Sequence, residues 1–247
     1  MSLLLGVLIT LLGLIIGSFL NAVLWRLRVR RPFIKGRSIC PRCQHVLGPS
    51  ELVPVVSFII LGGRCRHCRR TISWWYPAVE LATAGLYLAS WLRWGANPEL
   101  ILDLIIWPFL IVIFVYDWRW SLILDRISLP GAALAFLANL LLGRSLIDLL
   151  AGAILGGAFF GLQYFLSRGR WVGGGDMRLG LLIGAFLGWP GVLLCLGLAY
   201  SVGAIVGIAL IITRRKTWQS VIPFGTFLTA AAVVIRLLGY LVMPYFT

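Results

Sequence analysis

Long apolar runs constrain this chain more than any other feature. Of its 247 residues, 60% are hydrophobic and only 12% are charged, about half the charged share of a soluble domain. A helix needs about 20 apolar residues to cross roughly 30 Å of hydrocarbon. Runs near that length predict eight membrane-spanning helices, at 3–25, 75–94, 99–116, 127–143, 146–167, 177–190, 191–213 and 226–244. The fold class is therefore an all-α polytopic membrane protein.

Basic side chains predict the orientation of these helices. The segment 26–73 is the richest in arginine and includes Lys35, and further basic clusters lie at 119–126, 168–178 and 214–216. With eight spans, all four clusters fall on one side of the membrane. The positive-inside rule makes that side cytoplasmic and places both termini outside. Topology and anionic lipid headgroups then explain the net charge of +14, and no nucleic-acid partner is expected.

The longest polar loop contains two C-x-x-C pairs, formed by Cys40, Cys43, Cys65 and Cys68. Four thiolates at this spacing are typical of a zinc-ribbon-like loop around one tetrahedral zinc ion. Two redox or disulfide pairs are the alternative, and a reducing compartment disfavours them. His45 and His67 neighbour the pairs, but four cysteines already complete the shell of one zinc ion.

Two aspartates lie where predicted helices meet the cytoplasmic face. Asp117 follows the apolar run 105–116, and Asp176 follows the glycine triplet Gly173, Gly174 and Gly175. Each alone fits an ordinary helix end, Asp117 beside Arg119 and Asp176 as an N-cap. Together they predict two carboxyl groups that share a proton, as in aspartic proteases. The glycines would let an extended substrate backbone approach Asp176. Helix dipoles would make Asp176 the base and leave the proton on Asp117.

Of three other acids, Asp125 and Asp103 have ordinary explanations and Glu80 is less easily dismissed. Glu80 lies about one turn inside the predicted span 75–94, where a charge is costly, so a functional role and a structural one both stay open. Asp125 fits a cap or turn at the fourth span, and Asp103 is expected near the outer face.

The order of these motifs resembles the type IV prepilin peptidases, the leader peptidase/N-methyltransferases of bacterial membranes. The matching segments are Gly17-Ser18-Phe19-Leu20-Asn21, the cysteine pairs, Tyr76-Pro77-Ala78-Val79-Glu80-Leu81, Asp117 with Asp125 eight residues on, Gly173-Gly174-Gly175-Asp176 and Ile222-Pro223-Phe224-Gly225. Arg178 replaces a common lysine, and Leu124 and Thr226 stand where proline is common.

The resemblance implies a function and a division of the chain. Asp117 and Asp176 would be the catalytic pair of an inner-membrane enzyme that removes the basic leader of prepilins or pseudopilins. Methylation of the new amino terminus by S-adenosylmethionine would follow. Residues 1–95, with the zinc loop 26–73, would be the methyltransferase-associated part, and residues 96–247 a six-helix peptidase. No G-x-G-x-x-G follows a predicted strand, so the cofactor rests on the resemblance alone.

Three rival functions differ in what they require. Another intramembrane aspartyl protease of the G-x-G-D type would cut inside a helix. A proton-coupled transporter would use the aspartates as proton relays. A zinc-loop scaffold protein would not need them at all.

Overall fold

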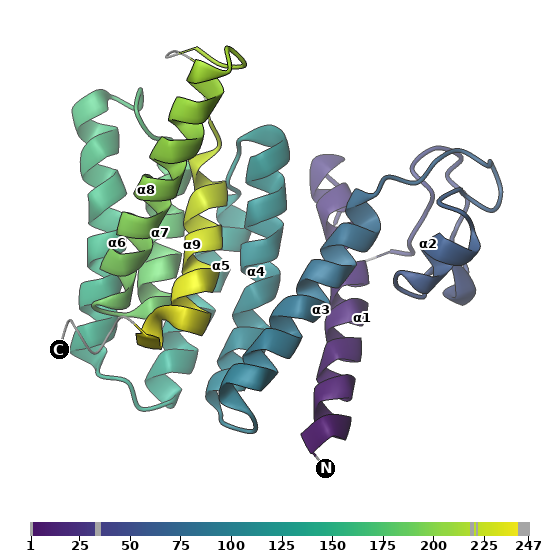
Figure 1. Ribbon diagram of the computed structural model, residues 1–247, viewed down its shortest axis with the longest axis horizontal. Helices are drawn as coiled ribbons and strands as arrows, with labels where there is room; N and C mark the ends of the chain where they lie inside the picture. The colour runs from purple at the N-terminus through teal and green to yellow at the C-terminus, as the bar shows by residue number, and fades with distance from the viewer. Residues whose placement is uncertain (1, 33–35, 218–219, 221, 242–247) are drawn as a thin grey trace. The chain divides into compact units, whose positions relative to one another are not determined.

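The computed structural model of the chain describes residues 2–32, 36–217, 220 and 222–241. Within these residues it contains helices and two isolated β-bridges but no strand, as the apolar runs predict (Figure 1). The longer helices are α1 (Ser2–Arg28), α3 (Trp75–Trp94), α4 (Glu99–Trp120), α5 (Asp125–Leu141), α6 (Leu146–Ser167), α7 (Gly174–Leu187), α8 (Gly191–Ile212) and α9 (Phe224–Leu238). The shorter elements are η1 (Pro49–Glu51), α2 (Val56–Ile60) and η2 (Gly239–Leu241).

Each predicted span overlaps one of the longer helices, and length and composition mark some of these helices as able to cross a bilayer. Among the described residues, α1, α4, α6 and α8 are long and apolar enough. Helix α7 has 14 residues, or about 21 Å at 1.5 Å per residue. Lys35 and the end of the span 226–244 lie outside the described residues. Eight spans with both termini outside therefore stay a prediction.

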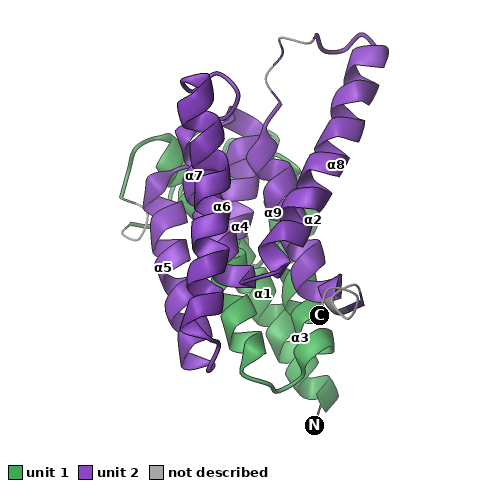
Figure 2. Ribbon diagram, turned by 90° about the vertical axis from the view of Figure 1, so that its left-hand side faces the viewer, with its two compact units in different colours: residues 1–108 green, residues 109–247 purple. Residues whose placement is uncertain are grey.

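The chain divides into two compact units, residues 1–108 and 109–247, with the boundary at Pro108 inside α4 (Figure 2). In the first unit, α1 packs against α3 through its glycines. A Cβ on Gly17 would lie 2.6 Å from the Cα of Glu80, and one on Gly13 would lie 2.7 Å from the Cα of Ala84. Glycine at these positions lets the two backbones touch.

A buried polar cluster joins α3 to the first half of α4. Asp103 is fully buried. Its Oδ2 accepts hydrogen bonds from Ser90 Oγ at 3.0 Å and Trp94 Nε1 at 2.8 Å, and Trp107 Nε1 donates to Ser90 Oγ at 2.8 Å. Buried carboxylates are costly unless they are hydrogen-bonded, and these donors offset the cost. A position near the outer face stays a prediction for Asp103, and the sequence did not predict these hydrogen bonds.

Helix α7 is the core of the second unit and packs against α5, α6 and α9. Its residues 182–187 are all buried, so this part of the helix packs against other helices. The crossing with α6 is made by glycines. Gly156 and Gly180 meet backbone to backbone, and a Cβ on Gly152 would lie 2.7 Å from the carbonyl oxygen of Gly184. This crossing fixes α7, and with it the start of α7 at Gly174.

Candidate functional site

The two cysteine pairs form knuckles with the same backbone pattern. In each knuckle the first cysteine's N–H donates to the carbonyl five residues on, and its carbonyl accepts from the N–H four residues on. The matching bonds, all 2.9 Å long, are Cys40 to His45, Gln44 to Cys40, Cys65 to Arg70 and Arg69 to Cys65. Gln44 and Arg69, which each follow a second cysteine, both have positive φ, at 61° and 53°. The loop therefore contains two copies of one local structure.

The knuckles bring the four sulfur atoms together. All four Sγ atoms lie within 4.8 Å of one another, and Cys40 Sγ is 4.0 Å from Cys68 Sγ. The cysteines are free thiols, since a disulfide would need sulfur atoms about 2.05 Å apart. Tetrahedral zinc with bonds of about 2.3 Å holds its sulfur ligands about 3.8 Å apart. The cluster could therefore hold a metal ion such as zinc.

Glu80 ties the loop to α3. Its Oε2 accepts a hydrogen bond from the Val55 N–H at 2.7 Å, and the residue is 7% exposed. Val55 has a φ of 60°, which is unfavourable for a β-branched residue. The carboxylate thus stabilises a strained turn just before α2. This contact gives Glu80 a structural role, and a functional role for it stays a prediction.

Asp117 lies three residues before the end of α4 and is 4% exposed. Its Oδ2 accepts two hydrogen bonds from Thr226, one from the backbone N–H at 2.7 Å and one from Oγ1 at 3.1 Å. Thr226 is the third residue of α9, where the backbone N–H groups have no partner inside the helix. The Asp117 carboxylate therefore caps the amino end of a helix 109 residues away in sequence, and two donors stabilise its negative charge.

Asp176 is the third residue of α7 and precedes the predicted span 177–190. It is not itself the N-cap, which is Gly173, but its Oδ2 accepts the Gly173 N–H at 3.0 Å. Burial raises the pKa of the Asp176 carboxyl to about 6; the Gly173 N–H opposes the rise, and the charge of Asp117 adds to it. The two aspartates are thus close enough to interact, each at the amino end of a helix.

Ile123, in the linker between α4 and α5, contacts the first turns of both α7 and α9. A Cβ on Gly175 would lie 2.8 Å from the Ile123 Cβ, and one on Gly225 would lie 2.9 Å from the Ile123 Cδ1 and 3.0 Å from the Asp117 Oδ2. Glycine at these two positions lets α7 and α9 begin beside Asp117. Packing against Ile123 therefore requires glycine at position 175. A Cβ on Gly173 or Gly174 would meet nothing closer than 3.5 Å.

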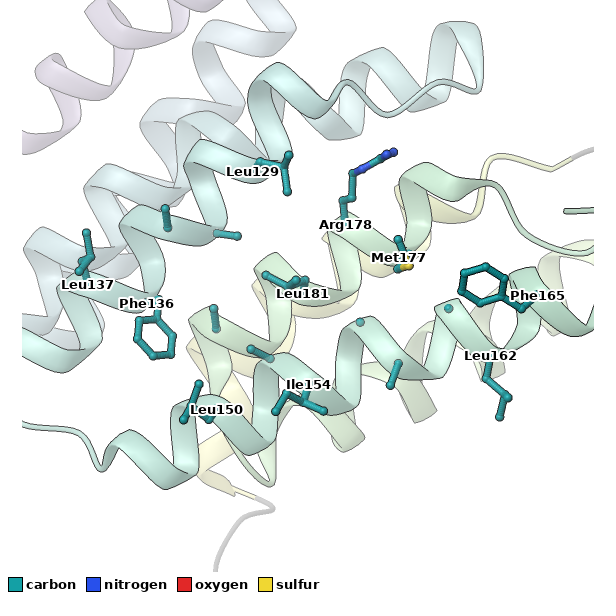
Figure 3. Close-up of a pocket in the computed structure, with 17 residues that line it drawn as sticks. Leu129, Phe136, Leu137, Leu150, Ile154, Leu162, Phe165, Met177, Arg178 and Leu181 are labelled. Atoms are coloured by element: carbon teal, nitrogen blue, oxygen red, sulfur yellow. The ribbon is translucent and has the colours of Figure 1, made fainter.

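Arg178 and Asp125 form an ion pair beside this site, with Nη1 2.9 Å from Oδ1. The pair links the first turn of α7 to the first turn of α5. Next to it, an apolar groove of about 1070 Å³ runs along α7 between α5 and α6 (Figure 3). Its lining includes Met177, Arg178 and Leu181 of α7, Leu129 and Phe136 of α5 and Ile154 of α6. Hydrocarbon is the only chemistry such a lining suits along most of its length.

Comparisons with known proteins match both halves of the chain. A family described as "Bacterial Peptidase A24 N-terminal domain" matches residues 11–94, and the "Type IV leader peptidase family" matches residues 104–208. A prepilin leader peptidase/N-methyltransferase of Bacillus subtilis is 34% identical over 95% of this chain and 94% of its own length. The chain belongs to the type IV leader peptidase family.

Other relatives of the same name agree. The Pseudomonas aeruginosa protein is 34% identical over 93% of this chain and 89% of its own length, and the Aeromonas salmonicida protein is 33% identical over 94% and 90%. No solved structure matches the chain significantly. The family match at 104–208 contains Asp117 and Asp176 but ends before Thr226, which the structure adds to the surroundings of Asp117.

The hydrogen bond from the Thr226 hydroxyl to Asp117 can be tested by mutation. Thr226→Val keeps the backbone N–H but removes the hydroxyl donor to Asp117, and a hydrogen bond to a charged group contributes about 1.5–3 kcal/mol. Cleavage by the purified variant is therefore expected to slow by about tenfold or more. Thr229→Val is the matched control, because that hydroxyl donates to carbonyl groups of its own helix. Equal rates for Thr226→Val and wild type would show that the hydroxyl does not support the site.

Proposed function

We propose that this chain removes the leader peptide of type IV prepilins or pseudopilins with Asp117 and Asp176 as its catalytic pair, and that it methylates the new amino terminus. The observation that supports the peptidase proposal is that Asp176 and Asp117, at the amino ends of α7 and α9, are close enough for the charge of Asp117 to raise the pKa of Asp176. Family membership supplies the substrate class, since the relatives are named prepilin leader peptidase/N-methyltransferase.

The hydrogen bonds around the pair support one assignment of roles. Asp117 receives two donors and Asp176 receives one, so hydrogen bonding favours the anion on Asp117. The raised pKa of Asp176 favours holding the proton there. This reverses the assignment drawn from the sequence. The carboxyl end of α4 disfavours an anion on Asp117, but Asp117 also caps the amino end of α9.

Hydrolysis then follows with every proton accounted for. The Asp117 carboxylate takes a proton from water while the water oxygen attacks the scissile carbonyl carbon. Asp176 donates its proton to the carbonyl oxygen, which gives a neutral tetrahedral intermediate. As the C–N bond breaks, Asp117 passes its proton to the leaving nitrogen. A hydroxyl of the intermediate returns a proton to Asp176, and the starting state is restored.

The proposed topology agrees with this substrate. With eight spans and both termini outside, the basic clusters, the cysteine loop and both aspartates share the cytoplasmic face of the inner membrane. A prepilin has a basic leader followed by an apolar helix, so its scissile bond would reach the same face. Anionic lipid headgroups would lie between the enzyme's arginines and that leader.

Two groups would assist the enzyme. Zinc on Cys40, Cys43, Cys65 and Cys68 would hold the two knuckles together in a loop that has little apolar core. S-adenosylmethionine would donate the methyl group, and residues 1–95 are proposed to support that step. The described residues form no sheet, so a Rossmann-type site is not the binding mode, and no residue is assigned to this cofactor.

The function is tested by incubating the purified protein with a full-length prepilin and S-adenosylmethionine, and measuring product masses. Loss of the leader, followed by a gain of one methyl group, is the expected result. An uncut prepilin would overturn the peptidase proposal and favour a transporter. A cut inside the apolar helix would favour the other class of intramembrane aspartyl protease.

The zinc proposal predicts a local effect. Cys40→Ser with Cys65→Ser removes two buried ligands, and structural zinc contributes roughly 10–16 kcal/mol of binding free energy in small domains. The loop is then expected to become sensitive to trypsin while the second unit keeps its thermal unfolding temperature. Cys195→Ser is the control, since Cys195 lies alone in α8 with its Sγ 3.6 Å from the Leu228 carbonyl oxygen. Unchanged proteolysis of the double variant would contradict a structural zinc ion.

A further inference from the structure

A second group of metal-binding side chains lies beside the cysteine cluster. His45 follows the first knuckle, His67 lies inside the second, and Glu51 ends η1 between them in sequence. One ligand atom from each lies within 4.8 Å of those of the other two. The three residues come from three separate parts of the loop, and none is among the four cysteines.

Glu51 is held in a position that suits a ligand. Its side chain is 8% exposed, and its Oε2 accepts the Gly48 N–H at 2.8 Å. A hydrogen-bonded second oxygen is the usual support of a carboxylate that binds a metal. The other oxygen, Oε1, lies 3.6 Å from His67 Nε2, which is too long for a hydrogen bond. Glu51 therefore approaches His67 without a hydrogen bond between them.

The two imidazole rings are also close, with centroids 3.4 Å apart and planes at 30°. Two neutral rings beside a carboxylate offer two nitrogen ligands and one oxygen ligand. Zinc with bonds of about 2.0–2.2 Å to such atoms holds them about 3.3 Å apart. The separation of 3.6 Å between Glu51 and His67 is near this value. Rings stacked at this distance cannot both point a nitrogen at one ion, so they would have to separate when the ion binds; both histidines are exposed, which leaves them room to turn.

We propose that His45, Glu51 and His67 form a second metal site, for one divalent cation of the zinc class, with water as the remaining ligand. Nitrogen ligands favour zinc or cobalt over magnesium or calcium, which prefer all-oxygen sites. The ion would join η1 to both knuckles. The site does not depend on the peptidase activity, and its test does not use that activity.

The experiment is a metal count on the full-length protein in detergent, purified without a histidine tag. Wild type, His45→Ala with His67→Ala, and Arg66→Ala are dialysed against buffered micromolar free zinc, and bound metal is measured by mass spectrometry. Arg66 is the matched control, because it is exposed and adjacent to His67 but outside the group. The proposal expects two ions per chain in wild type and in Arg66→Ala, and one in the histidine variant.

Cobalt distinguishes the two sites in the same protein. The first equivalent, on the cysteines, gives the strong thiolate-to-metal absorption. The second is expected to add only weak ligand-field bands, as nitrogen and oxygen ligands do. Glu51→Gln keeps an acceptor for the Gly48 N–H but removes the charge. This variant should lower the affinity for the second ion by more than roughly tenfold, which is the cost of losing an outer-shell partner.

Several results would overturn the second metal site. A single ion in wild type, a second ion that survives the histidine variant, or further thiolate absorption with the second cobalt would each refute the site. If the histidine variant lost both ions through misfolding of the loop, the affinity of Glu51→Gln for the second ion would test the site instead. Unchanged affinity for the second ion in that variant would refute the proposal as well.

Discussion

Asp117→Asn and Asp176→Asn are each expected to lower prepilin cleavage by about 10²–10⁴-fold, the range that a positioned acid or base contributes. Asparagine keeps the size of the side chain and can still accept a hydrogen bond. Thr226 could therefore still bond to residue 117, and Gly173 could still bond to residue 176. Neither amide can exchange a proton with water or with the scissile carbonyl, so chemistry should fail while the fold remains.

Asp125→Asn is the matched control for these two variants. Asp125 is eight residues from Asp117 and begins α5, but its carboxylate is half exposed and pairs with Arg178. An exposed ion pair contributes about 0–1 kcal/mol, so this variant should retain most of the activity. Loss of activity in Asp125→Asn, with cleavage by Asp117→Asn unchanged, would show that Asp125 and not Asp117 is the catalytic aspartate.

Gly180→Leu is expected to destabilise the second unit more than any single change in its surface. A Cβ on Gly180 would overlap the Gly156 carbonyl of α6 and lie 2.7 Å from the Phe160 Cδ2. Neither helix can move away, because α7 also packs against α5 and α9. Overpacking a core costs about 1–3 kcal/mol where side chains can adjust, and a backbone contact should exceed that.

Thermal unfolding of the purified protein in detergent measures this effect. Gly197→Leu is the matched control, since Gly197 lies inside α8 and a Cβ there would meet nothing within 4 Å. That variant should unfold at or above the wild-type temperature, because leucine is the better helix former. Similar unfolding temperatures for Gly180→Leu and wild type would show that the α6–α7 crossing is looser than the structure has it.

The sequence predicted the features that depend on local pattern. Apolar runs gave the positions of the helices because a buried or lipid-facing helix must be apolar along its length. The spacing of Cys40, Cys43, Cys65 and Cys68 predicted a metal cluster because each knuckle is a short local structure, and the four sulfur atoms do converge. The motif order predicted the family, which the relatives confirm.

Contacts between distant segments could not be predicted in this way. Thr226 meets Asp117 across 109 residues, and nothing in the local sequence of either residue indicates the other. The apolarity of α7 predicted a membrane span, but it did not predict that residues 182–187 would be buried against other helices. Composition does not distinguish a helix that faces lipid from one that faces other helices. The hydrogen bonds to Asp103 could not be predicted for a similar reason, since its donors, Ser90 and Trp94, lie on another helix.

The glycine triplet shows the same limit at the site itself. From the sequence, Gly173, Gly174 and Gly175 shared one explanation, access of a substrate backbone to Asp176. The structure separates them, because Gly175 packs on Ile123 while Gly173 caps α7 and is bonded to Asp176. A motif identifies which residues cooperate, but the role of each depends on what its neighbours in space require.

The most direct test of the paired site is to compare the cleavage rate of the double variant Asp117→Asn/Asp176→Asn with the rates of the two single variants, on one purified prepilin. When two groups act as a unit, replacing one already removes the catalytic contribution of both. The double variant should therefore cleave no more slowly than either single variant. Single variants whose losses multiply in the double variant, or one single variant that cleaves at the wild-type rate, would show that Asp117 and Asp176 do not form one catalytic pair.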